Sequence, residues 1–221
     1  MFKKVVMAIQ VQVFTFNPIQ ENTYVIYDDS KNCVIIDPGC YDRSEQQELL
    51  AFIQDNQLVP KALLNTHGHI DHVLGNAFVQ RQFQLDHYIH QEDLVTLKAV
   101  PNYAHMYGFP AYEEAETPNK ILKGGEMLKF GEIEFQVLFT PGHAPGHVVY
   151  YNAENKFVIN GDVLFRGSFG RYDLPGGNLE TLKKTIKNVM FSLPEDTTVF
   201  CGHGPTTTIG NEKRSNPILT Y

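Results

Sequence analysis

The sequence predicts an α/β protein in which two sheets carry helices on their outer faces. Three observations lead to this prediction. The chain has 221 residues, 43% of them hydrophobic and 19% charged, which is the balance of a globular protein with a sizeable core. Short β-rich segments occur in both halves of the chain. Helical patterns are interspersed among them, as is typical of sheets covered by helices. We expect residues 1–221 to form a single domain.

In the first half, runs of β-branched and aromatic residues separated by turn residues predict the strands. The first helix is expected to be capped by Ser44 and to bury Leu49, Leu50 and Ile53. The expected strands cover residues 11–16 (entering from about residue 3), 23–27, 33–36, 61–64 and 87–89, and the expected helices cover 44–56, 75–83 and 92–100.

In the second half, residues 101–125 are expected to be mostly irregular. This segment is rich in tyrosine, and residues 103–112 are expected to form either a lid or a covering layer on the core. Beyond it, a long helix is expected to bury Leu182, Ile186, Val189 and Met190. The expected strands cover residues 126–129, 133–139, 148–151, 157–160 and 198–200, and the expected helix covers 179–191.

Charge and composition argue against several classes of protein. With 18 basic and 25 acidic side chains, the net charge of −7 does not suit a protein that binds nucleic acid through its phosphates. No apolar run reaches the ~18 residues that span a membrane. Three cysteines cannot form a disulfide framework and suit a reducing compartment. Residues 5–9 are too short an apolar stretch for a signal peptide, so we expect a cytoplasmic protein.

A dense cluster of potential metal ligands directly follows the strand expected at residues 61–64. Residues 66–72 read THGHIDH, and such a group of polar side chains would be costly to bury without partners. On extended backbone His67 and His69 point to the same side. One histidine pair can chelate one metal ion, and Asp71 with His72 can hold a second.

Three more potential ligands follow later strands, each directly after a glycine. They are His143, Asp162 and His203. Loops at strand ends are where α/β folds gather their functional residues. Together with the first cluster, these residues make five histidines and two aspartates, which exceed one tetrahedral zinc shell and suffice for two metal ions.

With these residues in this order, the chain resembles the metallo-β-lactamase superfamily. Four segments are similar to the small glyoxalase II-like hydrolases of that superfamily, and the resemblance runs from about residue 22 to 217. The segments are TPGHAPGH at 140–147, GDVLF at 161–165, GSFGRYD at 167–173 and GHGP at 202–205. The resemblance implies a four-layer αβ/βα sandwich with metals at one end of the sheets.

The resemblance also assigns the seven potential ligands to two divalent metal ions. The assignment is His67, His69 and His143 to one ion, Asp71, His72 and His203 to the other, and Asp162 as a bridge between them. Zinc is the expected metal, with iron or manganese as alternatives, because imidazole and carboxylate suit all three.

The implied reaction is the hydrolysis of a small-molecule thioester such as S-D-lactoylglutathione. Two cations lower the pKa of a shared water, and the resulting bridging hydroxide attacks the carbonyl carbon. Asp71 is expected to orient this hydroxide. A thiolate leaves without a strong general acid, because the pKa of a thiol is about 8.5. Arg171, beside the glycine-rich loop at residues 167–170, would bind a substrate carboxylate or pair with Asp173.

An iron-dependent persulfide dioxygenase with one metal ion is the alternative function. Its branch of the superfamily shares the metal loop and a segment like GRYD at residues 170–173. A nuclease is disfavoured by the net charge, and a β-lactamase by the lack of an export signal. The short segment after His203 leaves no room for the C-terminal region with which larger glyoxalase II enzymes bind glutathione, so we expect modest affinity for glutathione itself.

Several other polar residues near these motifs are expected to have structural roles. His147 is expected to lie beside the ligands, and Cys201 to be a buried strand-end thiol. Residues 37–39, which read DPG, are expected to form a turn at a strand end, and the resemblance implies that this turn lies near the metal end of the sheets. Three further histidines are expected to be packing or surface residues, namely His87, His90 and His105. For His105, a place in the lining of the substrate cleft is the less favoured alternative.

Overall fold

The first half of the chain builds one six-stranded sheet. In the computed structural model, which describes residues 9–221, its order is β1-β2-β3-β4-β5-β6. The first three strands pair antiparallel and the last four run parallel. The elements are β1 Gln10–Phe16, β2 Glu21–Tyr27, β3 Asn32–Ile36, α1 Arg43–Asp55, β4 Val59–Leu64, η1 Ile70–His72, α2 Asn76–Phe83, β5 Asp86–His90, η2 Gln91–Asp93, α3 Leu94–Tyr103, η3 Ala104–Tyr107 and β6 Lys120–Leu122.

The second half builds the other six-stranded sheet, in the order β14-β13-β10-β9-β8-β7, and a small hairpin of β11 and β12. Its strands pair antiparallel except for β10 with β13. The elements are β7 Met127–Phe130, β8 Ile133–Phe139, β9 Val148–Asn152, β10 Phe157–Gly161, β11 Leu164–Phe165, β12 Ser168–Phe169, α4 Leu179–Asn188, η4 Met190–Ser192, β13 Thr198–Cys201, β14 Thr207–Thr208, α5 Ile209–Ser215 and η5 Pro217–Leu219.

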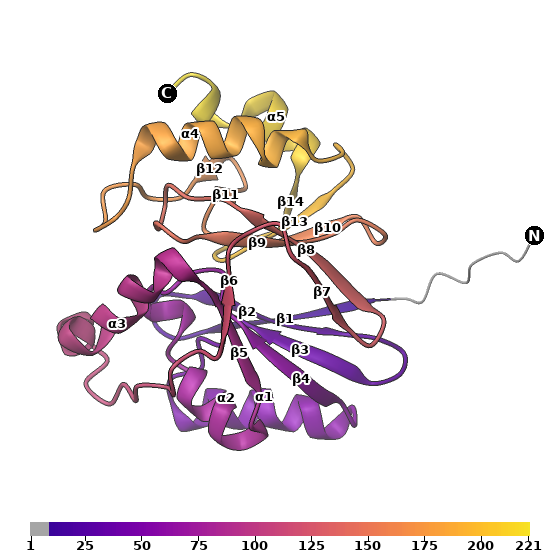
Figure 1. Cartoon of the computed structure of the whole chain (residues 1–221), viewed down its shortest axis with the longest axis vertical. Helices are drawn as coiled ribbons and strands as arrows, with labels where there is room; N and C mark the ends of the chain where they lie inside the picture. The colour runs from indigo at the N-terminus through magenta and orange to yellow at the C-terminus, as the bar shows by residue number, and fades with distance from the viewer. Residues whose placement is uncertain (1–8) are drawn as a thin grey trace, which may run out of the picture.

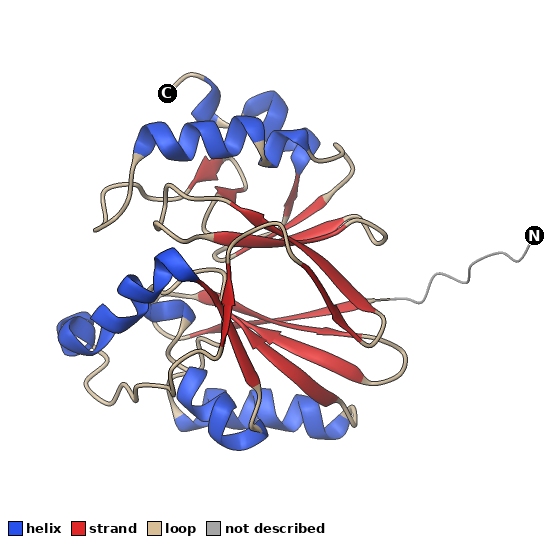
Figure 2. Ribbon diagram, in the orientation of Figure 1, coloured by secondary structure: helices blue, strands red, loops and turns tan. Residues whose placement is uncertain are grey.

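The two sheets face each other, with α1 and α2 outside the first and α4 and α5 outside the second (Figures 1 and 2). This arrangement confirms the predicted four-layer αβ/βα sandwich. The expected entry of the first strand near residue 3 lies outside the described residues. Within residues 9–221, the structure contains no helix with the length and apolar character needed to cross a membrane.

Strand β2 shows how the core is divided between the layers. Its alternating side chains point to opposite faces of the sheet. Tyr24 and Ile26 are buried between the sheets, together with Phe135 of β8. Val25, between them in sequence, packs outward in the cluster that contains Leu49 of α1. The middle of the first sheet is therefore buried on both faces, and β2 and β3 are buried along nearly their whole length.

Helix α1 is capped by Asp42, so the expectation that Ser44 caps it was wrong. The backbone of Asp42 is extended, and its carboxylate accepts hydrogen bonds from the N–H groups of Ser44 (2.8 Å) and Glu45 (3.0 Å). The Glu45 side chain in turn accepts from the Asp42 N–H, which completes a capping box. Ser44 lies inside the first turn of the helix, where its hydroxyl donates to Asp42.

The segment at residues 101–125 is more regular than expected. Helix α3 continues through Pro101 to Tyr103, because Leu97 and Val100 are buried against Ile89 and Phe109. Tertiary packing here outweighs the low helix propensity of proline. Strand β6 pairs parallel with β5. The sequence did not indicate this strand, because backbone hydrogen bonds form the pairing and do not require β-rich side chains.

The tyrosine-rich segment mainly forms a covering layer on the core. Phe109 is buried and packs edge-on against Tyr41 at 4.9 Å between ring centroids. Tyr103 and Tyr112 pack against the same apolar cluster. Tyr107 is exposed.

The capping box yields a prediction about stability. Replacing Asp42 with alanine removes the acceptor of two free N–H groups, and we expect the free energy of unfolding to fall by about 1 kcal/mol. Urea denaturation measures the change, as a lower midpoint at unchanged slope. Ser44→Ala is the matched control and should cost less than about 0.5 kcal/mol. Equal losses in the two variants would restore Ser44 as the cap.

Candidate metal centre

The seven potential ligands of the sequence analysis meet where several strands end. His67 and His69 lie directly after β4, and η1 carries Asp71 and His72. The other three come from the second sheet, namely His143 between β8 and β9, Asp162 after β10 and His203 after β13. The site therefore takes side chains from both sheets.

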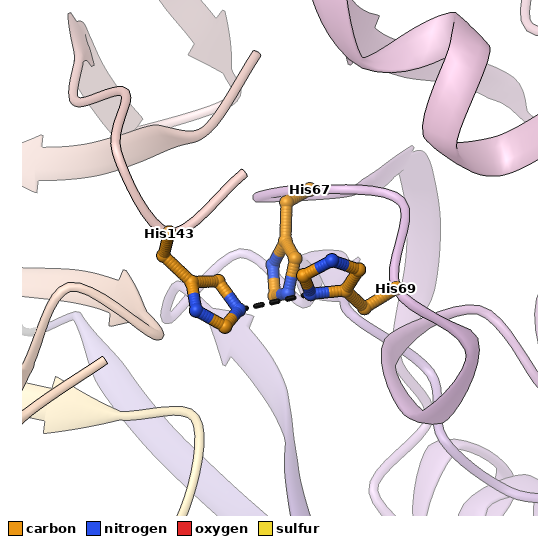
Figure 3. Close-up of side chains that lie close together, drawn as sticks. All are labelled: His67, His69 and His143. Atoms are coloured by element: carbon orange, nitrogen blue, oxygen red, sulfur yellow. Dashed lines mark hydrogen bonds between the residues drawn. The ribbon is translucent and has the colours of Figure 1, made fainter. Parts of the chain in front are cut away.

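The first group of ligands consists of His67, His69 and His143, whose rings converge in Figure 3. One ring nitrogen from each lies within 4.8 Å of the others. The closest approach is 2.9 Å, between His69 Nδ1 and His143 Nε2. His67 points to the same side as His69, as the predicted extended backbone requires.

The second group consists of Asp71, His72 and His203. The Nε2 atoms of His203 and His72 lie 3.1 and 3.7 Å from Asp71 Oδ2. His72 is fully buried, whereas about a quarter of the His203 side chain is exposed. This second group is thus the more open of the two.

Asp162 lies between the two groups. Its Oδ2 atom is 3.5 Å from Nε2 of both His143, in the first group, and His203, in the second. Its Oδ1 atom is 3.4 Å from His72 Nε2. A carboxylate in this place can serve two cations at once.

Hydrogen bonds on the far side of the ring fix the orientation of three of the histidines. The Nδ1 atom of His143 lies 2.7 Å from the carbonyl oxygen of Arg171, and that of His203 lies 3.1 Å from the carbonyl oxygen of Gln20. His67 Nδ1 is 3.0 Å from the Thr66 hydroxyl. Partners of this kind leave Nε2 facing the site and raise the ligand's basicity.

Asp37 lies beside the site, as the resemblance implied for residues 37–39, but its contacts with the ligands were not predicted. Its buried carboxylate lies 3.1 Å from His72 Nδ1 and accepts hydrogen bonds from the Thr66 N–H (2.7 Å) and hydroxyl. Asp37 thus fixes the position of Thr66, the first residue of the segment 66–72. Strands β3 and β4 are parallel neighbours, so Asp37 and Thr66 meet at one sheet edge, a pairing that the sequence alone does not reveal.

Glu21 is a site residue that the sequence analysis missed. It is fully buried at the start of β2, and its Oε1 atom lies 3.8 Å from His72 Nδ1. Burial raises the pKa of Glu21 well above its usual value, although His72 opposes the shift. The Thr23 hydroxyl donates to its other oxygen at 2.8 Å.

The remaining predicted residues divide between the site and its surroundings. The side chain of Arg171 is exposed and pairs with Asp173 through two hydrogen bonds of 3.0 and 2.9 Å. Substrate binding by Arg171 stays a prediction. His147 is buried, and its Nε2 accepts the Asp162 N–H at 3.1 Å. Cys201 is buried, as expected.

The arrangement fits metal ions because buried atoms are left without partners. His67 Nε2, His72 Nε2 and Asp162 Oδ1 are buried and have no hydrogen-bond partner within the described residues. Each such atom is costly unless something satisfies it. All three face the site, and nitrogen and carboxylate donors of this kind bind zinc, iron or manganese.

The pKa values of the two groups shift in opposite directions. Burial lowers the pKa of His67 well below its usual value and that of His69 to about 3, and neighbouring histidines add to the effect. Burial would also lower the pKa of His72, but the Asp162 and Asp71 carboxylates raise it well above its usual value. Burial likewise opposes protonation of His203, but a hydrogen bond to Asp71 and the charges of Asp162 and Asp71 together outweigh it and raise the pKa.

Comparisons with known proteins agree with this geometry. The family model described as "Metallo-beta-lactamase superfamily" matches residues 16–203. The protein named "Hydroxyacylglutathione hydrolase GloC" from Haemophilus influenzae is 37% identical over 210 residues, covering 95% of this chain and 97% of the relative.

Two solved structures are similar over nearly their whole length. One, described as the BLEG-1 B3 metallo-β-lactamase, has a TM-score of 0.88 and 38% identity, covering 96% of this chain and 100% of the other. The second, described as TTHA1623 in a di-iron-bound form, has a TM-score of 0.83 and 42% identity, covering 94% and 99%.

The opposite pKa shifts predict which group releases protons when it binds metal. Near pH 7 the imidazoles of His67 and His69 are already neutral, whereas the raised pKa values of His72 and His203 keep more proton on the second group. A cation must displace that proton. Affinity at the second group should therefore rise as the pH increases through these raised values, whereas affinity at the first should depend little on pH.

Two variants that each remove one group test this prediction. His143→Ala should weaken mainly the first group and His203→Ala mainly the second. Calorimetric metal titration in two buffers of different ionisation enthalpy counts the protons released. We expect clear release from the His143→Ala variant and little from His203→Ala. Equal release from both would contradict the assignment.

Proposed function

This chain belongs to the metallo-β-lactamase superfamily, and we propose that it is a metal-dependent hydrolase that binds two divalent ions and cleaves a thioester. The observation that carries the proposal is the pair of three-residue ligand groups with Asp162 between them. A structural zinc site has four ligands, often including cysteine. The seven histidine and aspartate residues suit a catalytic metal site better than a structural one, because the site is partly exposed to solvent at His203.

We propose His67, His69 and His143 as ligands of one ion, Asp71, His72 and His203 as ligands of the other, and Asp162 as the shared ligand. Divalent ions, when bound, lower the pKa of water and stabilise negative charge that develops on a carbonyl oxygen. Zinc remains our expectation. The similar TTHA1623 structure is described as di-iron-bound, which supports iron as the alternative.

The chain's own residues orient the reacting groups. Asp71 Oδ2 lies 3.1 Å from His203 Nε2. Burial raises the pKa of Asp71, but the charge of His72 and the hydrogen bond from His203 outweigh it and lower the pKa below its usual value. Asp71 is therefore ionised at neutral pH and can orient a water or hydroxide by accepting its hydrogen bond. Water adds to the carbonyl carbon, the C–S bond breaks, and the products are a carboxylate and a thiol.

A thioester suits this site because its leaving group needs little protonation. A thiol with a pKa of about 8.5 can depart as thiolate. The name of the Haemophilus relative supports an acylglutathione as substrate. That relative is matched over 97% of its length, so a protein of similar size carries the name without an added C-terminal region.

Two other activities serve as competing hypotheses. A persulfide dioxygenase would use one iron with open positions for O₂ and substrate, and the complete second ligand group argues for two ions instead. β-Lactam hydrolysis is supported by the likeness to the B3 metallo-β-lactamase structure. The number of bound metal ions distinguishes the dioxygenase from our proposal, and the substrate that is cleaved distinguishes the β-lactamase.

Removal of the shared ligand should affect both ions. We expect Asp162→Ala to weaken binding of each ion about 10–100-fold, because this one carboxylate lies near both groups. Metal analysis after dialysis against a weak chelator measures the loss. Asp173→Ala, an exposed aspartate paired with Arg171, is the control and should keep both ions. If Asp162→Ala retained two tightly bound ions, the shared role would be refuted.

The reaction is tested with three substrates on the same zinc- and iron-loaded preparations. We expect hydrolysis of S-D-lactoylglutathione to exceed both oxygen uptake with glutathione persulfide and hydrolysis of a chromogenic cephalosporin. The reason is that two ions sharing one water favour hydrolysis, and thiolate departure needs no general acid. Oxygen uptake by the iron form without thioester cleavage in either form would favour the dioxygenase, and cephalosporin hydrolysis alone would favour a β-lactamase.

A further inference from the structure

Asp93 contacts two of the ligand loops although it belongs to neither ligand group. It ends η2, directly before α3, and its side chain is completely buried. Its Oδ2 atom accepts a hydrogen bond from the N–H of Gly68, and its Oδ1 atom accepts one from the N–H of Gly146 at 3.0 Å. The Thr96 hydroxyl also donates to Oδ1, at 3.2 Å.

The two glycines lie in the loops that supply the first ligand group. Gly68 separates His67 from His69, and Gly146 follows His143 in the loop between β8 and β9. One carboxylate therefore joins a loop of the first sheet to a loop of the second. Hydrogen bonds to an ionised oxygen are about twice as strong as those between neutral groups.

Both loops also press closely against the start of α3. A Cβ atom at Gly68 would overlap the backbone of Leu97, and one at Gly146 would overlap the backbone of Asp93. Only glycine allows this approach. The end of η2 and the first turn of α3 thus contact both loops, and the Asp93 carboxylate is hydrogen-bonded to each of them.

We propose that Asp93 is a positioning residue that holds His67 and His69 at the correct distance from His143, and so sets the affinity of this group for its metal ion. The proposal rests on the proposed metal centre, but not on the thioester reaction. A separate backbone bond, from the Val148 N–H to the Thr66 carbonyl at 2.9 Å, also joins the two loops. The loops should therefore stay docked when Asp93 is changed, with their alignment relaxed.

Asp93→Asn is the most direct test. The amide keeps the shape of the side chain but turns one acceptor into a donor, so one glycine N–H loses its partner. Titration of metal-free protein with Co²⁺, followed by its visible absorption, reports affinity and ligand geometry at each group. We expect affinity at the first group to fall about 10–100-fold, the range for residues that orient metal ligands, and affinity at the second to change less than about threefold.

Asp28→Asn is the matched control. Asp28 is also buried and accepts backbone hydrogen bonds, from Asn32 at 2.9 Å and Glu132 at 3.0 Å. It follows the end of β2 that is remote from Glu21 and the site. This variant should lose stability and keep the Co²⁺ affinity of both groups. In ¹⁵N-labelled Asp93→Asn protein, the amide resonances of Gly68 and Gly146 should move, whereas in Asp28→Asn they should not.

Unchanged Co²⁺ affinity in Asp93→Asn, or equal weakening at both groups, would overturn the proposal. If that variant does not fold, Thr96→Val removes only the hydroxyl donor to Asp93. It should weaken the first group severalfold and spare the second, and no selective effect there would also overturn the proposal. A wild-type protein that binds two Co²⁺ ions but cleaves no thioester would refute the reaction proposed above and leave the role of Asp93 intact.

Discussion

The structure depends on the gathering of seven ionisable side chains, five of them buried, at one place between two sheets. Three of their polar atoms have no hydrogen-bond partner among the described residues, and in a protein interior this arrangement is stable only when something else compensates the polar atoms. The surrounding chain is organised around that constraint. Carbonyl oxygens, Thr66 and Asp37 hold the far sides of four of the rings, so that the Nε2 atoms of these rings face the site.

On the side of the second sheet, the C-terminal part of the chain holds the hairpin of β11 and β12 in place through hydrogen bonds. The buried Glu212 of α5 accepts the Gly167 N–H at 3.0 Å, and Asn216 donates to the Ser168 carbonyl at 2.8 Å. These bonds fix β11 and β12, which lie between Asp162 and Arg171. The Arg171 carbonyl then contacts the His143 ring. The C-terminal part of the chain thereby contributes to the orientation of a ligand that it does not touch.

Local patterns in the sequence predicted the longer strands and every α-helix except α5, but not the short strands β6, β11, β12 and β14. Spacing on one segment brought four potential ligands together, and the ends of later strands indicated the other three. The misses have a common cause, which is that they depend on contacts between distant segments. Asp37 and Glu21 both approach His72, and Asp93 binds Gly68 and Gly146, which are distant in sequence in every case. Helix α3 continues past Pro101, and β6 forms, because packing and pairing outweigh local propensity.

Asp37 also carries backbone strain, since its φ of 49° lies in the left-handed region that few non-glycine residues adopt. Such a conformation costs on the order of 1–3 kcal/mol. Glycine would relieve this cost, but only a carboxylate accepts hydrogen bonds from Thr66 while facing His72. The strain at Asp37 is therefore retained together with its hydrogen bonds to Thr66 and its contact with His72, so the conformational cost of this one residue is linked to the orientation of a potential metal ligand.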